Sequence, residues 1–250
     1  MRLGAALALL AVLAVAGCGF GSDDEPEPLS EGRRALALAV RATPAAGTAR
    51  VAFRVRSLPG GEIDIRGAGL ARLDSDEGRY DFSIESFPGL PASVEAEARV
   101  ADALTYLRRR GTRRFTPFEG DAAVPTSIDT VLPYLGAVTG PVRPAGQGTV
   151  RGVRTSVYRA TVNLDLVDEG LPEERQAAFR IQVKRFATKR VPVMIEVDGK
   201  GRLRRIAYRV ERLVKPGPGE DRGISYRAEL YDFGAKGDTS RPPPRLIDRD

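Results

Sequence analysis

The sequence contains no histidine and no tryptophan, and only one cysteine among its 250 residues. Without histidine, the Ser-His and Cys-His pairs of many hydrolases are excluded, and so are imidazole metal ligands. A single cysteine has no disulfide partner within the chain. Carboxylate pairs such as those of glycosidases could still act as acid and base, but no spacing of Asp and Glu residues in the sequence indicates such a pair. We therefore expect no enzyme activity and no cofactor.

Metal binding has one weak signal in the sequence. Residues Asp74–Gly78, with Glu85 at the twelfth position, are similar to a calcium-binding EF-hand loop. The sixth position of that loop requires glycine, and here it is Arg79. We therefore interpret Asp74–Gly78 as a hairpin turn between two strands and expect no metal site.

The only long apolar run lies at the N-terminus. Met1 and Arg2 precede the apolar run Leu3–Ala14, and small residues stand before Cys18. The run is shorter than the roughly 18 to 20 residues that span a bilayer, so residues 1–17 are interpreted as a cleaved signal peptide. The segment resembles a bacterial lipobox, which implies that Cys18 is acylated and anchors the chain to the outer face of the cell membrane. An ordinary signal peptide with an incidental cysteine is the alternative.

The next segment, residues 18–29, is rich in glycine, proline and acidic residues and is interpreted as a flexible tether. We expect a single domain over residues 30–250. Its basic residues are almost all arginine, since only five of the 39 are lysine, and the net charge is +6. A basic surface is attracted to anionic lipid, by about 1 kcal/mol for each cation near the membrane. Nucleic acid is not an expected partner of an exported protein.

Most of the domain alternates apolar and charged residues, which is typical of strands with one buried face. Val51, Phe53 and Val55 alternate with Arg50, Arg54 and Arg56 in this way. The pattern predicts further strands around residues 63–73, 80–85, 94–99, 104–107, 149–166, 191–197, 206–210 and 224–230. The segment 108–123 is interpreted as a break between strands.

Helical spacing occurs in three places. Ser30 is positioned to cap a helix that ends near Arg41, Ile128–Leu135 forms a second apolar face, and Leu171-Pro172 opens a third helix. The predicted fold is therefore α+β, an open antiparallel β half-barrel of about 10 to 11 strands wrapped around about three helices. Because so few helices cannot cover so wide a sheet, either the sheet closes on itself or an apolar cavity remains for a ligand.

The order of helices and strands resembles the LolA-like half-barrel, and in particular the LppX and LprG type of actinobacterial lipoproteins. The resemblance extends over nearly the whole chain after the leader. The residues that carry it are Val150–Tyr158, Val191–Gly199, Gly201–Ile206, Tyr231–Gly234, Pro242-Pro243 and Asp248. It implies a sheet wrapped around helices and an apolar cavity that holds acyl chains of lipids in transit through the envelope. The basic segment Arg108–Phe118 departs from the family pattern.

The sequence therefore predicts a monomeric, membrane-anchored lipoprotein that binds lipid or glycolipid and carries or presents it across the envelope, with an envelope transporter as a candidate partner. The alternative is a protein-binding sensor or accessory lipoprotein with a filled core. Candidates for the lipid cavity come from the apolar faces, and plain core packing is the alternative for each. They are Val51, Phe53, Val55, Phe82, Ile84, Leu132, Leu135, Phe179 and Val183. Candidates for binding a phosphate-bearing headgroup are Arg108, Arg109, Arg110, Arg113 and Arg114, for which a solvated loop is the alternative.

Overall fold

The computed structural model describes residues 30–58, 63–75, 77–87, 93–102, 104–119, 131–169, 171, 173–184, 186–211 and 223–248. The predicted signal peptide, Cys18 and the tether lie outside the described residues. Within them, no helix is long and apolar enough to cross a membrane.

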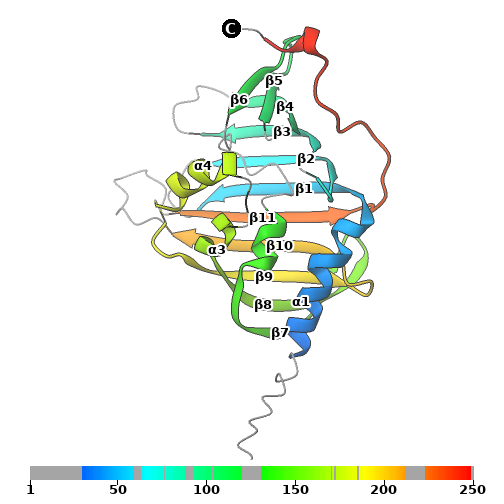
Figure 1. Ribbon diagram of the computed structural model, residues 1–250, viewed down its shortest axis with the longest axis vertical. Coiled ribbons are helices and arrows are strands. Elements are labelled where there is room, and N and C mark those ends of the chain that lie inside the picture. Colours follow the sequence, from blue (N-terminus) through cyan, green and yellow to red (C-terminus); the bar gives the residue numbers. More distant parts are fainter. Residues whose placement is uncertain are drawn as a thin grey trace, which may run out of the picture.

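The eleven strands of the described residues form one antiparallel sheet (Figure 1). Their order across the sheet is β6-β5-β4-β3-β2-β1-β11-β10-β9-β8-β7, which places the first and last strands of the chain side by side at the centre. The strands are β1 (Thr48–Ser57), β2 (Asp64–Arg72), β3 (Gly78–Ser86), β4 (Val94–Ala101), β5 (Leu104–Arg109), β6 (Thr116–Glu119), β7 (Val138–Val150), β8 (Val153–Asn163), β9 (Arg190–Asp198), β10 (Leu203–Glu211) and β11 (Gly223–Tyr231).

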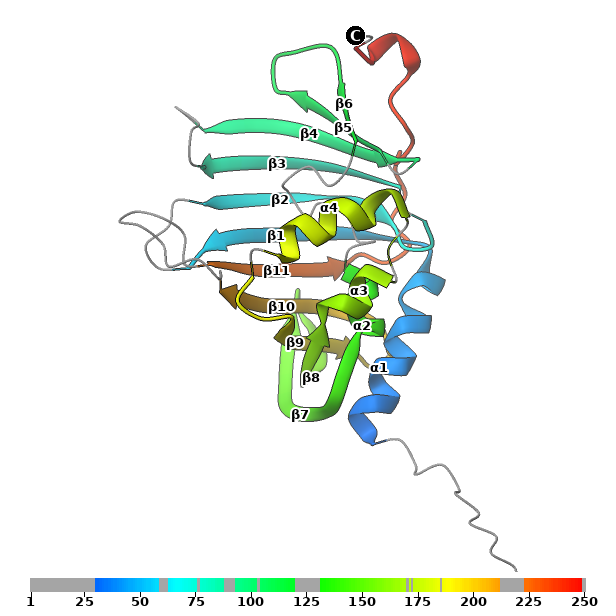
Figure 2. The ribbon, with the colours of Figure 1, turned by 60° about the vertical axis from the view of Figure 1, so that its left-hand side comes forward.

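The α-helices of the described residues lie on one side of the sheet, and we call this side the inner face (Figure 2). They are α1 (Glu31–Ala42), α2 (Val131–Gly136), α3 (Leu164–Glu169) and α4 (Glu173–Val183), and short 3-10 helices span Pro44–Ala46 and Pro244–Leu246. The predicted cap of α1 is confirmed, because Ser30 Oγ accepts a hydrogen bond from the backbone N–H of Arg33 at 3.4 Å. The predicted open antiparallel sheet is confirmed, whereas the expected number of about three helices is not.

Two local predictions were wrong, and one strand was missed. The predicted long strand over residues 149–166 is divided, because β8 ends at Asn163 and the next residues form α3. The break predicted at residues 108–123 contains the end of β5 and the short strand β6. Strand β7 was not predicted, because its prolines and glycines interrupt the alternation, and its pairing with β8 shifts register at two places.

The alternation of β1 is confirmed and defines the two faces of the sheet. Val51, Phe53 and Val55 are buried on the inner face, and the arginines at positions 50, 54 and 56 are exposed on the outer face. Each inner residue of β1 lies beside its paired residues on the neighbouring strands. Phe53, for example, pairs with Gly67 on β2, which in turn pairs with Phe82 on β3. The apolar core therefore lies between the inner face and the helices.

The C-terminal segment after β11 connects the middle of the sheet to its far edge (Figure 1). Asp238 pairs with Arg99 of β4 at 3.0 Å. Further along, the backbone N–H of Phe115 donates to the carbonyl of Leu246 at 2.7 Å, and the N–H of Asp248 donates to the carbonyl of Phe115 at 2.8 Å. The segment thus holds the β5–β6 edge of the sheet in place, where the outermost strand, β6, is short.

Candidate functional site: the inner face of the sheet

The nine predicted cavity residues come together in one apolar cluster. Val51, Phe53 and Val55 come from β1, Phe82 and Ile84 from β3, Leu132 and Leu135 from α2, and Phe179 and Val183 from α4. Seven of them are buried members of the core, while Ile84 and Leu132 are half-buried and pack against it. The structure therefore places all nine on the same interior. Their contact with lipid stays a prediction.

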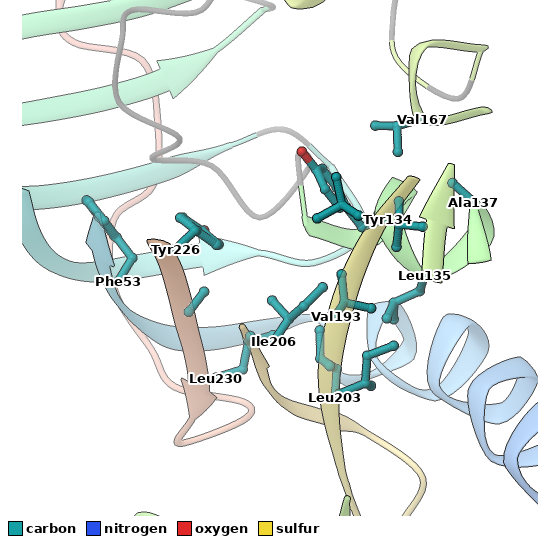
Figure 3. Packing of buried hydrophobic residues seen from close by; sticks show 14 of the residues in the cluster. Phe53, Tyr134, Leu135, Ala137, Val167, Val193, Leu203, Ile206, Tyr226 and Leu230 are labelled. Atoms are coloured by element: carbon teal, nitrogen blue, oxygen red, sulfur yellow. The ribbon is translucent and has the colours of Figure 1, made fainter. Parts of the chain in front are cut away.

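The centre of this interior contains a stack of three tyrosines that sequence reasoning did not identify. The ring of Tyr208 stacks on Tyr134 of α2, with centroids 5.4 Å apart, and on Tyr226 of β11, with centroids 5.0 Å apart. Figure 3 shows Tyr226, Ile206 and Phe53 of neighbouring strands on the same side of the sheet as Tyr134. The period-two pattern places Tyr208 and Tyr226 on apolar faces, but only the strand register brings them into contact.

Tyr208 and Tyr226 of the stack are neutral at physiological pH. Burial raises the pKa of Tyr208 well above its ordinary value, and the neighbouring phenol of Tyr134 acts in the same direction. Burial likewise raises the pKa of Tyr226. The interior therefore offers apolar surface and uncharged hydroxyl groups, a chemistry suited to an apolar ligand and unsuited to an ion.

The packing of the inner face differs between its two halves. The described helices lie over the part of the sheet from β7 to β1, with α4 reaching the level of β1 and β2, whereas β3 to β6 extend past them (Figure 2). In the same region, Ile84, Val94, Ala96 and Leu107 are only half-buried on the inner face. We call these four residues the open apolar row. They leave apolar surface accessible that a filled core would cover.

Glycines in β2 make room for aromatic rings on this face. A Cβ added at Gly67 would lie 2.4 Å from Cζ of Phe53 and 2.9 Å from Cβ of Phe82. The ring of Phe53 also meets Tyr80 edge-on, with centroids 6.3 Å apart. Gly67 thus allows aromatic side chains of β1 and β3 to lie over the strand between them.

Substituting Gly67 by valine is expected to destabilise the protein, because the added methyl groups would overlap the ring of Phe53. Overpacking of this kind costs about 1 to 3 kcal/mol of unfolding free energy. Urea denaturation measures the change, and Ala68→Val is the matched control, since Ala68 is the next residue and is exposed on the outer face. Equal unfolding midpoints for the two variants would contradict the packing described here.

The outer face of strands β2 to β5 carries a trough lined by charged residues. It has a volume of about 910 Å³, and its walls include Arg66, Asp81, Glu95, Glu97 and Arg108. Glu97 is only 7% exposed, accepts hydrogen bonds from Arg99 at 3.1 Å and from Arg108, and forms an ion pair with Arg79 at 3.1 Å. Paired charges line this trough, so it is unsuited to acyl chains.

The five arginines predicted to bind a headgroup do not form one cluster. Arg108 pairs with Glu97, Arg110 pairs with Glu95, and Arg114 lies 3.7 Å from Asp248. The guanidinium groups of Arg109 and Arg113 have no ion pair or hydrogen bond among the described residues. The five residues are therefore not equivalent, although their role in headgroup binding is still a prediction.

Comparison with solved structures identifies the architecture. The structure of LprF from Mycobacterium bovis aligns with a TM-score of 0.51 and 14% sequence identity, covering 85% of this chain and 97% of that one. The lipoprotein LppX from Mycobacterium tuberculosis aligns with a TM-score of 0.51 and 13% identity, covering 84% of this chain and 98% of that one. The chain has the LppX–LprG type of fold. The resemblance predicted from the sequence is thereby confirmed for the fold.

No protein-family model and no curated protein matches the sequence. Identities of 13% and 14% establish the fold alone. Among the described residues, no group of three or more acidic or cysteine side chains could hold a metal ion.

Proposed function

We propose that this protein is an envelope lipoprotein that binds the acyl chains of a lipid or glycolipid on the inner face of its sheet and carries or presents that lipid across the cell envelope. The open apolar row carries the proposal, because Ile84, Val94, Ala96 and Leu107 keep accessible apolar surface beside a large core. Each buried CH₂ group of an acyl chain contributes about 0.8 kcal/mol, so a chain of ordinary length is enough for tight binding.

The anchor is the second part of the proposal. Acylation of Cys18 would hold the protein at the outer face of the cell membrane, and the tether of residues 18–29 would let the folded domain move toward a donor or acceptor. The basic composition of the chain supports residence beside anionic lipid, because each cation near the membrane surface adds about 1 kcal/mol of attraction. An envelope transporter fits as a source of lipid.

Gentle purification and organic extraction test the lipid-binding part. The full chain with Cys18→Ser, which removes the acylation site, is purified without detergent, and the extract is measured by mass spectrometry. We expect co-purifying lipid close to one molecule per protein. Empty protein in repeated preparations, together with little fluorescence of the apolar dye ANS, would instead favour a protein-binding lipoprotein with a filled interior.

A further inference from the structure

The arginine run at the end of β5 is divided by the alternation of the strand. Arg108 lies opposite Glu97 and pairs with it on the outer face. Arg110 follows the strand and pairs with Glu95, also an outer-face residue. Between them, Arg109 lies opposite Ala96, and the register continues from Ala96 to Phe82. Arg109 therefore belongs to the inner face, at the rim of the sheet.

On the inner face the neighbours of Arg109 are apolar, and the residue also borders the charged trough. Its row contains Ala96, Phe82, Gly67 and Phe53, and the flanking positions of the open apolar row are Leu107 and Val94. The side chain of Arg109 is exposed, and its guanidinium has no acidic partner among the described residues. Of the arginines on β5, it is the one that combines an uncompensated charge with the apolar face.

A guanidinium beside apolar surface is a strong recognition element for one class of ligand. Arginine keeps its charge at all physiological pH values and binds phosphate or carboxylate through two parallel hydrogen bonds. Less water surrounds a group at the edge of an apolar face, so the electrostatic attraction to an anion is stronger than in open solvent. An amphiphile whose chains lie along Phe82 and Ala96 would bring its polar end to this rim.

We propose that Arg109 binds the acidic headgroup of an anionic lipid whose acyl chains lie on the open apolar row. This assignment rests on the proposed lipid-binding function and adds the charge class of the lipid to it. Arg108 and Arg110 take no part, because their charges are already matched by Glu97 and Glu95.

Two labelled lipids with identical acyl chains test the proposal on the full chain carrying Cys18→Ser. One is phosphatidic acid, with an anionic phosphate, and the other is diacylglycerol, with no charge. We expect Arg109→Gln to weaken binding of phosphatidic acid about 10-fold, the range of a charge-assisted pair, and to leave diacylglycerol within about 2-fold. Arg109→Lys should recover part of the loss, because it keeps the charge without the fork of donors.

Arg159→Gln is the matched control, because Arg159 is also exposed and without an ion pair among the described residues but lies on the outer face of β8. It removes the same charge and should change neither lipid. Equal weakening by Arg109→Gln and Arg159→Gln, or equal weakening of both lipids by Arg109→Gln, would overturn the proposal.

Two further arms separate the sources of failure. Glycerol 3-phosphate should not displace labelled phosphatidic acid at millimolar concentration, and displacement would assign Arg109 to a free phosphate ester and overturn the lipid assignment. If wild-type protein binds neither labelled lipid, the proposed function itself fails. If it binds diacylglycerol and Arg109→Gln has no selective effect, lipid binding stands and only the headgroup assignment fails.

Discussion

Ile84→Asp is expected to remove lipid from this protein while leaving it folded. Ile84 is half-buried on the inner face, where it lies opposite Ile65 of β2 and Val94 of β4. In the absence of lipid, a carboxylate at this position keeps part of its hydration. An acyl chain on the open apolar row would strip that water away, and burying an unpaired charge costs several kcal/mol. We therefore expect lipid affinity to fall by about 100-fold or more.

Extraction and mass spectrometry of the purified variant measure this effect, and urea denaturation checks that the fold survives. Ser225→Asp is the control, because it adds the same charge on the outer face of β11, between Arg56 and Arg209. The control should retain lipid at the wild-type level. Wild-type lipid content in Ile84→Asp would show that the acyl chains do not lie along the open apolar row.

Glu97→Gln is expected to produce a large loss of stability. Its carboxylate is buried, accepts hydrogen bonds from Arg99 and Arg108, and forms an ion pair with Arg79. Removing the charge leaves these guanidinium groups close together without a counterion. Breaking a buried ion pair by removing one partner costs about 3 to 5 kcal/mol. Glu95→Gln, at an exposed pair with Arg110, should change the unfolding free energy by less than about 1 kcal/mol.

The pH dependence of unfolding gives the same interaction a second readout. Burial raises the pKa of Glu97, but hydrogen bonds from Arg99 and Arg108 outweigh it, and the net pKa lies below the ordinary value of 4.5. The carboxylate therefore stabilises the fold above that value, and its contribution is lost as the pH falls from 4.5 through the lower folded-state pKa. The stability of Glu97→Gln should depend less on pH in this window than that of wild type. If the unfolding free energies of wild type and Glu97→Gln changed equally with pH in this window, the role assigned to Glu97 would be contradicted.

Much of the sheet follows from the period of two in the sequence. Val51, Phe53 and Val55 alternate with Ala52 and Arg54 between flanking arginines, and this predicts both β1 and its buried face. The helix cap at Ser30 follows from an equally local rule. The nine apolar candidates were also predicted to share one interior, because strands with one buried face and amphipathic helices must pack those faces together.

Other features depend on contacts that a local pattern does not contain. Leu164 continues the alternation of β8, yet it begins α3, because the chain leaves the sheet at that point and Leu164 is buried in the core. In β7, Pro144 and Gly146 conceal a strand that is held by its pairing with β8. The arginines 108–110 read as one basic cluster, and only the register of β4 and β5 separates Arg109 from its neighbours.

Photo-crosslinking of a bound lipid tests the central claim most directly. A phospholipid with a diazirine in its acyl chain is bound to the full chain carrying Cys18→Ser, irradiated, and mapped by mass spectrometry of the digested protein. The account predicts adducts on inner-face residues of β3 to β5, namely Phe82, Ile84, Ala96 or Leu107, that disappear when unlabelled lipid competes. Adducts confined to the outer face, or labelling that unlabelled lipid does not reduce, would contradict it.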